Sequence, residues 1–310
     1  MVAAPATNRS AKRSRLKASP LVAAGLGLAL AAIGARPANA ADPAVARGAY
    51  LSAAAGCDQC HTDAKNGGAP YAGGRAMATE FGTIVTPNIT PDKATGIGGW
   101  SLGDFVRAMR WGIGPDGTHY VTAFPYPYFS RLTDSDLADL KAFLDSVAPV
   151  TRPGLGAASS LALLARARAA VGEAFAANFA GPSATLPAPR DAAVLRGAYL
   201  ANSAGHCGDC HTPQSWFGAS DSGREFAGSA GWFNGRKAPN ITPDPKTGIG
   251  GWSEEEIASL LKDGGTPDGD FVGGAMAEIV RNTERLTDDD RHAIAAYLKA
   301  PPPKAFGENK

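Results

Sequence analysis

Two short segments of the chain carry the residues best suited to chemistry. Each has two cysteines three positions apart and a histidine directly after the second, at Cys57, Cys60 and His61 and again at Cys207, Cys210 and His211. Two cysteines at this spacing can each form a thioether with one vinyl group of a haem, and the adjacent histidine can then bind the iron. The pattern predicts two covalently bound c-type haems, with His61 on the first iron and His211 on the second.

The same cysteine spacing also occurs in thioredoxin-type redox pairs and in halves of zinc sites. A thioredoxin pair belongs in a βαβ unit, and this sequence has no evident strand pattern. A zinc site needs four ligands close together, whereas the two cysteine pairs lie far apart in the chain. Both alternatives therefore fit the sequence less well than haem attachment.

The two cysteine motifs belong to an internal repeat. Residues 47–50 (RGAY) recur at 196–199, residues 87–92 (PNITPD) at 239–244, residues 95–101 (TGIGGWS) at 247–253 and residues 132–134 (LTD) at 286–288. The spacing between the copies drifts only slightly along the chain, which indicates two copies of one domain with short loop insertions. We predict one domain over residues 41–150, a second over residues 191–310, and a linker over residues 151–190.

Residues that suit helix caps predict where helices begin. A serine or threonine with an acidic residue three positions later occurs twice in each copy, at Ser101 and Asp104, Thr133 and Asp136, Ser253 and Glu256, and Thr287 and Asp290. Apolar residues then share one face of each closing helix, at Leu137, Leu140 and Leu144 and at Ile294 and Leu298. With 38 glycines and 23 prolines in 310 residues, we predict an all-α fold of short helices joined by long loops.

Residues 1–40 are typical of a secretory signal peptide. Basic residues precede an uncharged apolar run over residues 18–35, and the small residues Ala38 and Ala40 suit cleavage after Ala40. We therefore expect an exported, periplasmic protein, with an uncleaved anchor as the alternative. Beyond this segment acidic residues outnumber basic ones, which argues against a nucleic-acid partner.

The linker contains a candidate amphipathic helix. Within residues 155–180, Leu161, Leu164, Val171 and Phe175 fall on one face at helical spacing. Charged residues interrupt this run too early for a membrane-spanning helix. We predict a helix packed between the domains, and the alternative is a helix that makes peripheral contact with a membrane surface.

The order of these motifs resembles a known family. A CxxCH motif, the PNITPD and TGIGGWS segments, an Asp-Gly turn and the LTDxD helix start together resemble the cytochrome c subunits of bacterial periplasmic membrane-bound dehydrogenases, such as those for alcohols, gluconate and fructose. The resemblance implies two tandem class I cytochrome c domains. It also implies an electron-transfer protein or subunit, with a periplasmic or membrane-bound dehydrogenase as donor and a quinone, cytochrome or oxidase as acceptor. Those relatives commonly have three haem domains, whereas this sequence has two haem motifs, and this departure leaves the identity of the partner open. A molybdenum-containing or flavin-containing partner is therefore a further alternative.

Met276 is the candidate sixth ligand of the second haem iron. It follows Ala275 in a predicted loop between the middle and closing helices, where the family places an alanine and a methionine. Methionine opposite histidine raises the haem potential and closes the iron to small molecules. The alternative is that Met276 fills a gap in the core, as methionine often does.

The first copy has Phe124 where the second has Met276, and phenylalanine cannot bind iron. His119, a few residues earlier in the same loop, is the first candidate for the sixth ligand; an ordinary loop histidine or one near a haem propionate is the alternative. Met77 is a further candidate if its loop folds over the haem edge. Met109 aligns with a leucine inside the middle helix, so we expect it in the core.

The missing methionine also leaves a second function open. With no ligand opposite His61, the first haem could bind a small substrate such as peroxide or a sulfur oxyanion and act as an enzyme. Against this, the sequence places few acids or bases near that loop beyond Asp116 and His119. We therefore expect an electron-transfer protein and no catalytic residues.

Four further residues suit ordinary structural roles. Asn88 and Asn240 could bond to a haem propionate, but an Asx turn is the commoner use of asparagine in such a segment. His206 directly precedes a cysteine, and its counterpart is Gly56, so we expect it to be exposed. His292 begins the closing helix of the second copy and is expected on the surface.

Overall fold

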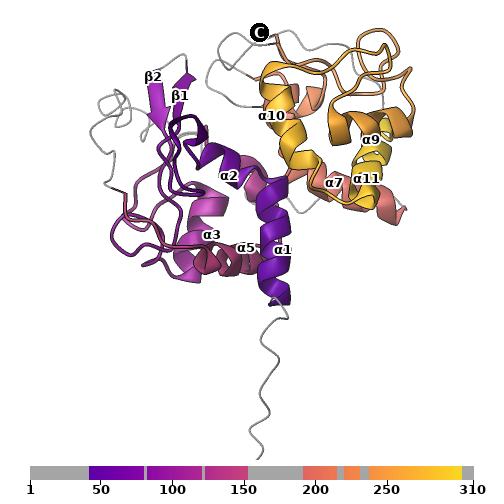
Figure 1. Ribbon diagram of the computed structural model, residues 1–310. Coiled ribbons are helices and arrows are strands. Elements are labelled where there is room, and N and C mark those ends of the chain that lie inside the picture. Colours follow the sequence, from indigo (N-terminus) through magenta and orange to yellow (C-terminus); the bar gives the residue numbers. More distant parts are fainter. Residues whose placement is uncertain are drawn as a thin grey trace, which may run out of the picture. The chain divides into compact units, whose positions relative to one another are not determined.

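Short helices and long loops build the part of the chain that the computed structural model describes (Figure 1). That part comprises residues 42–79, 82–120, 123–152, 191–214, 220–230 and 237–301. It belongs to one structural unit, residues 41–310. We call residues 42–152 the first half and residues 191–301 the second half. The predicted signal peptide and the linker helix lie outside the described residues.

Each half has its helices in a similar order. In the first half they are α1 (Pro43–Ala54), α2 (Cys57–Cys60), α3 (Leu102–Trp111), α4 (Tyr126–Phe129) and α5 (Asp134–Ser146), with a 3-10 turn η1 (Ala64–Asn66). In the second half they are α7 (Ala192–Asn202), α8 (Cys207–His211), α9 (Glu254–Asp263), α10 (Gly274–Thr283) and α11 (Asp288–Lys299), with a 3-10 turn η2 (Ser222–Arg224). The prediction of a helix-rich fold is confirmed. Among the described helices, none is long and apolar enough to span a membrane.

The first half also contains a strand pair, which the all-α prediction missed. Strand β1 (Ala76–Thr79) pairs antiparallel with β2 (Gly82–Val85), and Met77 lies opposite Ile84. Thr83, Ile84 and Val85 of β2 are β-branched, which favours an extended backbone. Four residues are too few for a strand period to stand out in a sequence, so the pair left no clear signal.

The predicted helix starts are confirmed. Ser101 and Ser253 are the N-caps of α3 and α9, and each forms a complete capping box with the acidic residue three positions later. Thr133 and Thr287 are the N-caps of α5 and α11. Each of these side chains accepts a hydrogen bond from the N–H that the first helical turn leaves unpaired.

The core of each half forms where its first helix crosses its last. Helix α1 packs on α5, and α7 packs on α11 (Figure 1). Gly48 and Gly197 make the crossings possible, because an added Cβ would lie 2.0 Å from the carbonyl oxygen of Asp139 and 1.8 Å from that of Ala293. The apolar faces predicted for the closing helices are buried, at Leu137, Leu140, Leu144, Ile294 and Leu298.

An aromatic residue with a left-handed backbone occurs in each half and adds to these cores. Tyr71 has a φ of +62° and Phe226 a φ of +64°, a conformation that non-glycine residues rarely adopt. The ring of Tyr71 meets Phe143 of α5 edge to face at 5.7 Å, and that of Phe226 meets Tyr297 of α11 at 6.0 Å. The same unusual backbone and the same ring contact therefore occur in both halves.

Candidate haem centres

The two motif histidines are held in the same way. The Nδ1 atom of His61 lies 2.8 Å from the carbonyl oxygen of Pro87, and that of His211 lies 2.8 Å from the carbonyl oxygen of Pro239. A carbonyl oxygen only accepts hydrogen bonds, so Nδ1 carries the proton and the lone pair of Nε2 is free for a metal. Burial lowers the pKa of both imidazoles, which keeps them neutral and able to bind iron.

Buried asparagines fix the loops that carry these prolines. The side-chain oxygen of Asn88 accepts from the backbone N–H of Thr90 at 2.9 Å, and that of Asn240 accepts from the N–H of Thr242 at 2.8 Å. Both are Asx turns, the role expected from the sequence. They hold the chain directly after the proline whose carbonyl orients the histidine.

Sequence reasoning missed the threonine that directly follows each histidine and anchors the next loop. Thr62 and Thr212 directly follow the two histidines, and their hydroxyls accept from the backbone N–H groups of Tyr71 and Phe226, each at 3.1 Å. These bonds hold the left-handed aromatic residues in place. The threonine is visible in both motifs as CHT, but the aromatic residue is not, because the loops before it differ in length.

The four cysteines form no disulfide bond, and two lie in each motif. Cys57 and Cys207 pack against the hydrophobic core, whereas Cys60 and Cys210 are exposed. Burial raises the pKa of Cys57 to about 12 and that of Cys207 to about 11, which disfavours the thiolate form of both side chains. Within the described ranges, no group of three or more histidine, cysteine, aspartate or glutamate side chains is placed to hold a metal ion.

This donor set fits a c-type haem. Each motif offers two thiols on one helical turn and a neutral imidazole whose Nε2 is free. The second half also has a buried polar atom without a partner, the hydroxyl of Ser229. Ser229 exchanges two backbone hydrogen bonds with Ala238, next to Pro239, so this hydroxyl lies in the segment that orients His211.

Met276 lies in helix α10, not in the loop that the sequence analysis expected. Residues 275–278 (Ala-Met-Ala-Glu) have high helix propensity, so the helix begins at the preceding glycine, Gly274, and includes Met276. In the first half, Pro125 directly follows the corresponding residue, Phe124, and α4 begins only at Tyr126. Met276 and Phe124 are both half-buried and pack against the core, so the two halves use corresponding positions with different side chains.

The two other candidate ligands lie on separate segments of the first half. His119 is half-buried and pairs with Ile113 in an isolated antiparallel bridge. Met77 is half-buried on β1. Phe124 fills its position between the rings of Tyr120 and Phe129, at 5.9 and 5.5 Å. Iron ligation by His119, Met77 or Met276 remains a prediction.

The remaining two histidines are both engaged. The expectation that His206 is exposed is wrong: it is half-buried, with a φ of +35°, and its ring meets the edge of Phe129 at 5.7 Å. The cause is a contact with the other half, which sequence spacing does not reveal. His292 is exposed as expected, and it also bonds to Glu255.

Comparisons with known proteins agree with this donor set. The family model for cytochrome c matches residues 45–148. The chain is 40% identical over 259 residues to a diheme cytochrome c-type protein of Cereibacter sphaeroides, covering 83% of this chain and 85% of that protein. It is 37% identical to the cytochrome c subunit of alcohol dehydrogenase (quinone) from Gluconobacter oxydans, covering 96% of this chain and 63% of the subunit.

A third relative is the fructose dehydrogenase cytochrome subunit of Gluconobacter japonicus, 36% identical over 87% of this chain and 55% of the subunit. The chain thus spans less than two thirds of either dehydrogenase subunit. Cytochrome c proteins bind haem covalently and transfer electrons, and the relatives favour that role over a haem enzyme acting on peroxide or a sulfur oxyanion. On its similarity over most of a dihaem relative, the chain belongs to the cytochrome c family.

Proposed function

We propose that the chain is a periplasmic dihaem cytochrome c that takes electrons from a dehydrogenase and passes them to a downstream respiratory acceptor. One observation carries the proposal. The histidine support of the first half, where the family model matches, recurs in the second half outside the match: both Nδ1 atoms lie 2.8 Å from a proline carbonyl oxygen. A second haem-binding domain is the simplest reason for the chain to repeat this support.

The proposed architecture is two tandem class I cytochrome c domains, over residues 41–150 and 191–310, joined by residues 151–190. The repeated helix crossings at Gly48 and Gly197 and the repeated left-handed aromatics support it. In each domain the two cysteines would attach the haem, and His61 or His211 would bind its iron. A bound c-type haem supplies a one-electron couple between ferric and ferrous iron.

The protein's own residues would set how each haem behaves. The proline carbonyls keep the proton on Nδ1 of His61 and His211 and so direct Nε2 toward the iron. Met276 would close the second iron and raise its potential. With His119 on the first iron instead, its potential would be lower, so electrons would enter at the first domain and leave from the second.

The proposed donor follows from the relatives. Two of them are subunits of alcohol and fructose dehydrogenases, which supports a dehydrogenase of this kind as the electron donor. The acceptor would be a quinone, a cytochrome or an oxidase. The periplasmic location is supported by the signal-peptide pattern of residues 1–40, with cleavage after Ala40.

The test is a haem count on the chain produced with its export signal and periplasmic haem attachment. We expect two haems per chain in the unmodified protein. The double variant Cys57→Ser and Cys60→Ser should keep only the second haem, and the variant Cys207→Ser and Cys210→Ser only the first. The two variants serve as controls for each other, since each removes one motif and leaves the other intact.

The electron-transfer step is tested with a purified dehydrogenase and its substrate. An alcohol or fructose dehydrogenase catalytic subunit without its own cytochrome should reduce both haems, as followed by visible absorption. A single haem in the unmodified protein contradicts the dihaem proposal. Two haems that no such subunit reduces contradict the dehydrogenase as donor.

A further inference from the structure

Two helix starts in this structure are completed by the opposite half of the chain. At α3 and α9, the acidic residue at the third helical position bonds back to the N-cap N–H and completes a capping box. At α5 and α11 the N-cap N–H has a different partner. Thr133 donates to the hydroxyl of Tyr199, and Thr287 donates to the hydroxyl of Tyr50.

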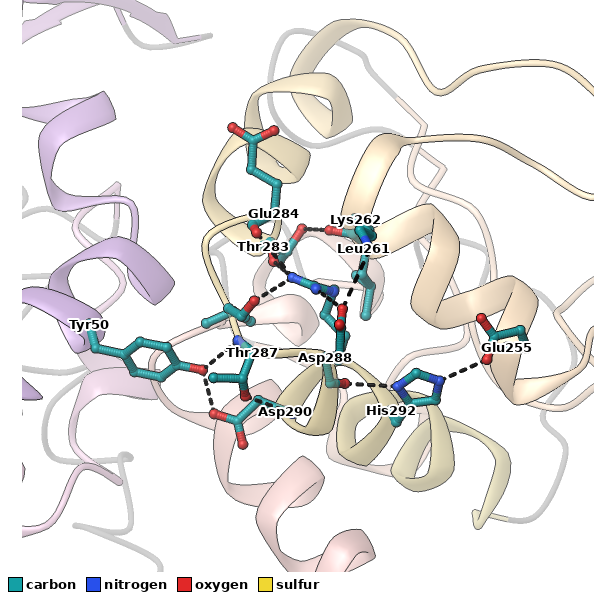
Figure 2. A network of polar contacts seen from close by, with 12 residues as sticks. Tyr50, Glu255, Leu261, Lys262, Thr283, Glu284, Thr287, Asp288, Asp290 and His292 are labelled. Carbon is teal, nitrogen blue, oxygen red and sulfur yellow. Dashed lines mark hydrogen bonds and ion pairs between the residues drawn. The ribbon is translucent and has the colours of Figure 1, made fainter.

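Each tyrosine hydroxyl bridges the two groups that would otherwise close the capping box. Figure 2 shows the bridge at α11: Thr287 N–H donates to the Tyr50 hydroxyl at 3.1 Å, and that hydroxyl donates to Asp290 at 2.5 Å. The bridge at α5 has the same form. Thr133 N–H donates to Tyr199 at 3.1 Å, and Tyr199 donates to the carboxylate of Asp136.

These bridges are reciprocal. Tyr50 and Tyr199 are the last residues of the repeated RGAY segment, and each caps the closing helix of the half to which it does not belong. Asp290 is also held by Arg196 of its own half, through two bonds of 2.8 and 2.7 Å. Burial, together with the bond to the carboxylate, raises the pKa of Tyr50 and raises that of Tyr199 to about 12, so both hydroxyls stay protonated donors near neutral pH.

A second set of contacts extends this interface to the cysteine motifs. Arg285, which follows α10, makes two bonds of 2.9 Å to Asp58, the residue after the first cysteine of the first motif. Gly208 has the same place in the second motif, and a Cβ added there would lie 3.1 Å from the hydroxyl of Tyr128 on α4. Each motif therefore lies close to the other half: the first motif bonds to Arg285, directly after α10, and the second lies beside Tyr128 of α4.

We infer that Tyr50 and Tyr199 are positioning residues that hold the two haem-attachment segments at one fixed separation. This inference rests on the proposed function, in which both segments carry haem. Electron transfer between two centres depends steeply on the distance between them, so a fixed separation would keep transfer along the chain fast. Each half supplies one tyrosine to the interface, and that tyrosine caps the closing helix of the other half. This reciprocal arrangement gives a reason for the tyrosine to occur in both copies.

The test measures electron equilibration between the two haems of the full, haem-loaded chain. Pulse radiolysis delivers less than one electron per chain, and visible absorption then follows its redistribution. Tyr50→Phe and Tyr199→Phe each remove only the hydroxyl that bonds to the other half. Because the separation of the halves is then less fixed, each variant should slow electron equilibration, and the double variant should slow it several-fold. The two midpoint potentials should stay unchanged, because neither hydroxyl is part of a haem-binding motif.

Two further variants make the result specific. Ser146→Ala removes a hydroxyl bonded to the backbone carbonyl oxygen of Phe143 within the first half, and it should leave the equilibration rate unchanged. Arg285→Gln breaks the independent contact with Asp58 and should slow equilibration. If the double variant carries two haems and its electron equilibration is as fast as in the unmodified chain, this inference is wrong and the proposed function stands. Fewer than two haems in the unmodified chain would overturn the proposed function and this inference with it.

Discussion

The two halves of the chain share the hydrogen bonds around the motif histidine and differ at the position of Phe124 and Met276. Both hold Nδ1 of the histidine at 2.8 Å from a proline carbonyl oxygen, and both hold a left-handed aromatic residue through a threonine hydroxyl at 3.1 Å. At the predicted sixth-ligand position the first half has Phe124 and the second has Met276. On the proposed function, the repeated histidine support would hold a haem in each half, and the difference between Phe124 and Met276 would give each haem its own potential.

A second difference lies in the closing helices. Leu137 is fully buried at the start of α5, and the corresponding residue in α11 is Arg291, whose side chain is 5% exposed. The Arg291 guanidinium donates to the backbone carbonyls of Thr283, Glu284 and Leu286. At this corner position in the closing helix, the first half therefore has a buried apolar side chain, and the second half has a charged side chain that makes buried hydrogen bonds.

The largest expected effect comes from exchanging the residues at the sixth-ligand position. Met276→Leu should leave the second iron open, so the reduced protein should bind carbon monoxide at that haem and its potential should fall. Phe124→Met should raise the potential of the first haem for the same reason. Carbon monoxide difference spectra and redox titration check both outcomes.

Met109→Leu is the matched control for the exchange, because Met109 is buried in α3 as part of the core. It should alter neither carbon monoxide binding nor the potentials. If Met276→Leu behaves like this control, Met276 is a core residue, and the difference between the halves does not concern the iron.

The sequence predicts those features that depend on neighbouring residues. The capping residues Ser101 and Ser253 place two helices correctly because a cap is a local interaction between side chain and backbone. The cysteine motifs and the Asx turns are local in the same sense. The left-handed backbone of Tyr71 is not, since a bond from Thr62 and a ring contact with Phe143 hold it there.

Contacts between the halves are the least predictable part of the structure. The repeat shows that Tyr50 and Tyr199 correspond, but the sequence does not indicate that each caps a helix of the other half. The burial of His206 has the same origin, a ring contact with Phe129. Such contacts depend on how two folded halves meet, and neither spacing nor periodicity along one half contains that information.

A smaller effect is expected from placing methionine at both corner positions. Arg291→Met removes the donor for three backbone carbonyl oxygens, two of them in buried hydrogen bonds, and we expect it to lower the free energy of unfolding by about 2–4 kcal/mol. Leu137→Met keeps the volume nearly constant and should lower it by less than about 1.5 kcal/mol. Urea unfolding followed by circular dichroism measures both.

Arg281→Met is the control for loss of an arginine at the surface. Arg281 is 62% exposed and lies 4.0 Å from Glu278, so its removal should change the free energy by no more than about 0.5 kcal/mol. Equal changes in the free energy of unfolding for Arg291→Met and Leu137→Met would mean that the hydrogen bonds of the buried guanidinium add no stability beyond the packing of the side chain.

The smallest expected effect is a pH dependence confined to the second half. His292 bonds to Glu255 and to the carbonyl oxygen of Asp288, each at 2.8 Å (Figure 2), and the first half has Ala138 at this position. The bond to Glu255, followed by that to Asp288, raises the pKa of His292 above its usual value. Because the folded state binds the proton more tightly, the stabilisation is full below about pH 6.5 and is lost as the pH rises through the higher folded pKa.

The side chain of His292 is 46% exposed, so solvent screens the ion pair and we expect at most about 0.5 kcal/mol. The measurement is the free energy of unfolding at about pH 5.5 and about pH 8, on either side of the usual histidine pKa. His292→Ala should remove this part of the difference between the two pH values, and Glu255→Gln should reduce it. A His292→Ala variant that keeps the unmodified pH dependence would show that other groups cause it, since the ion pair can act only while the imidazole is charged.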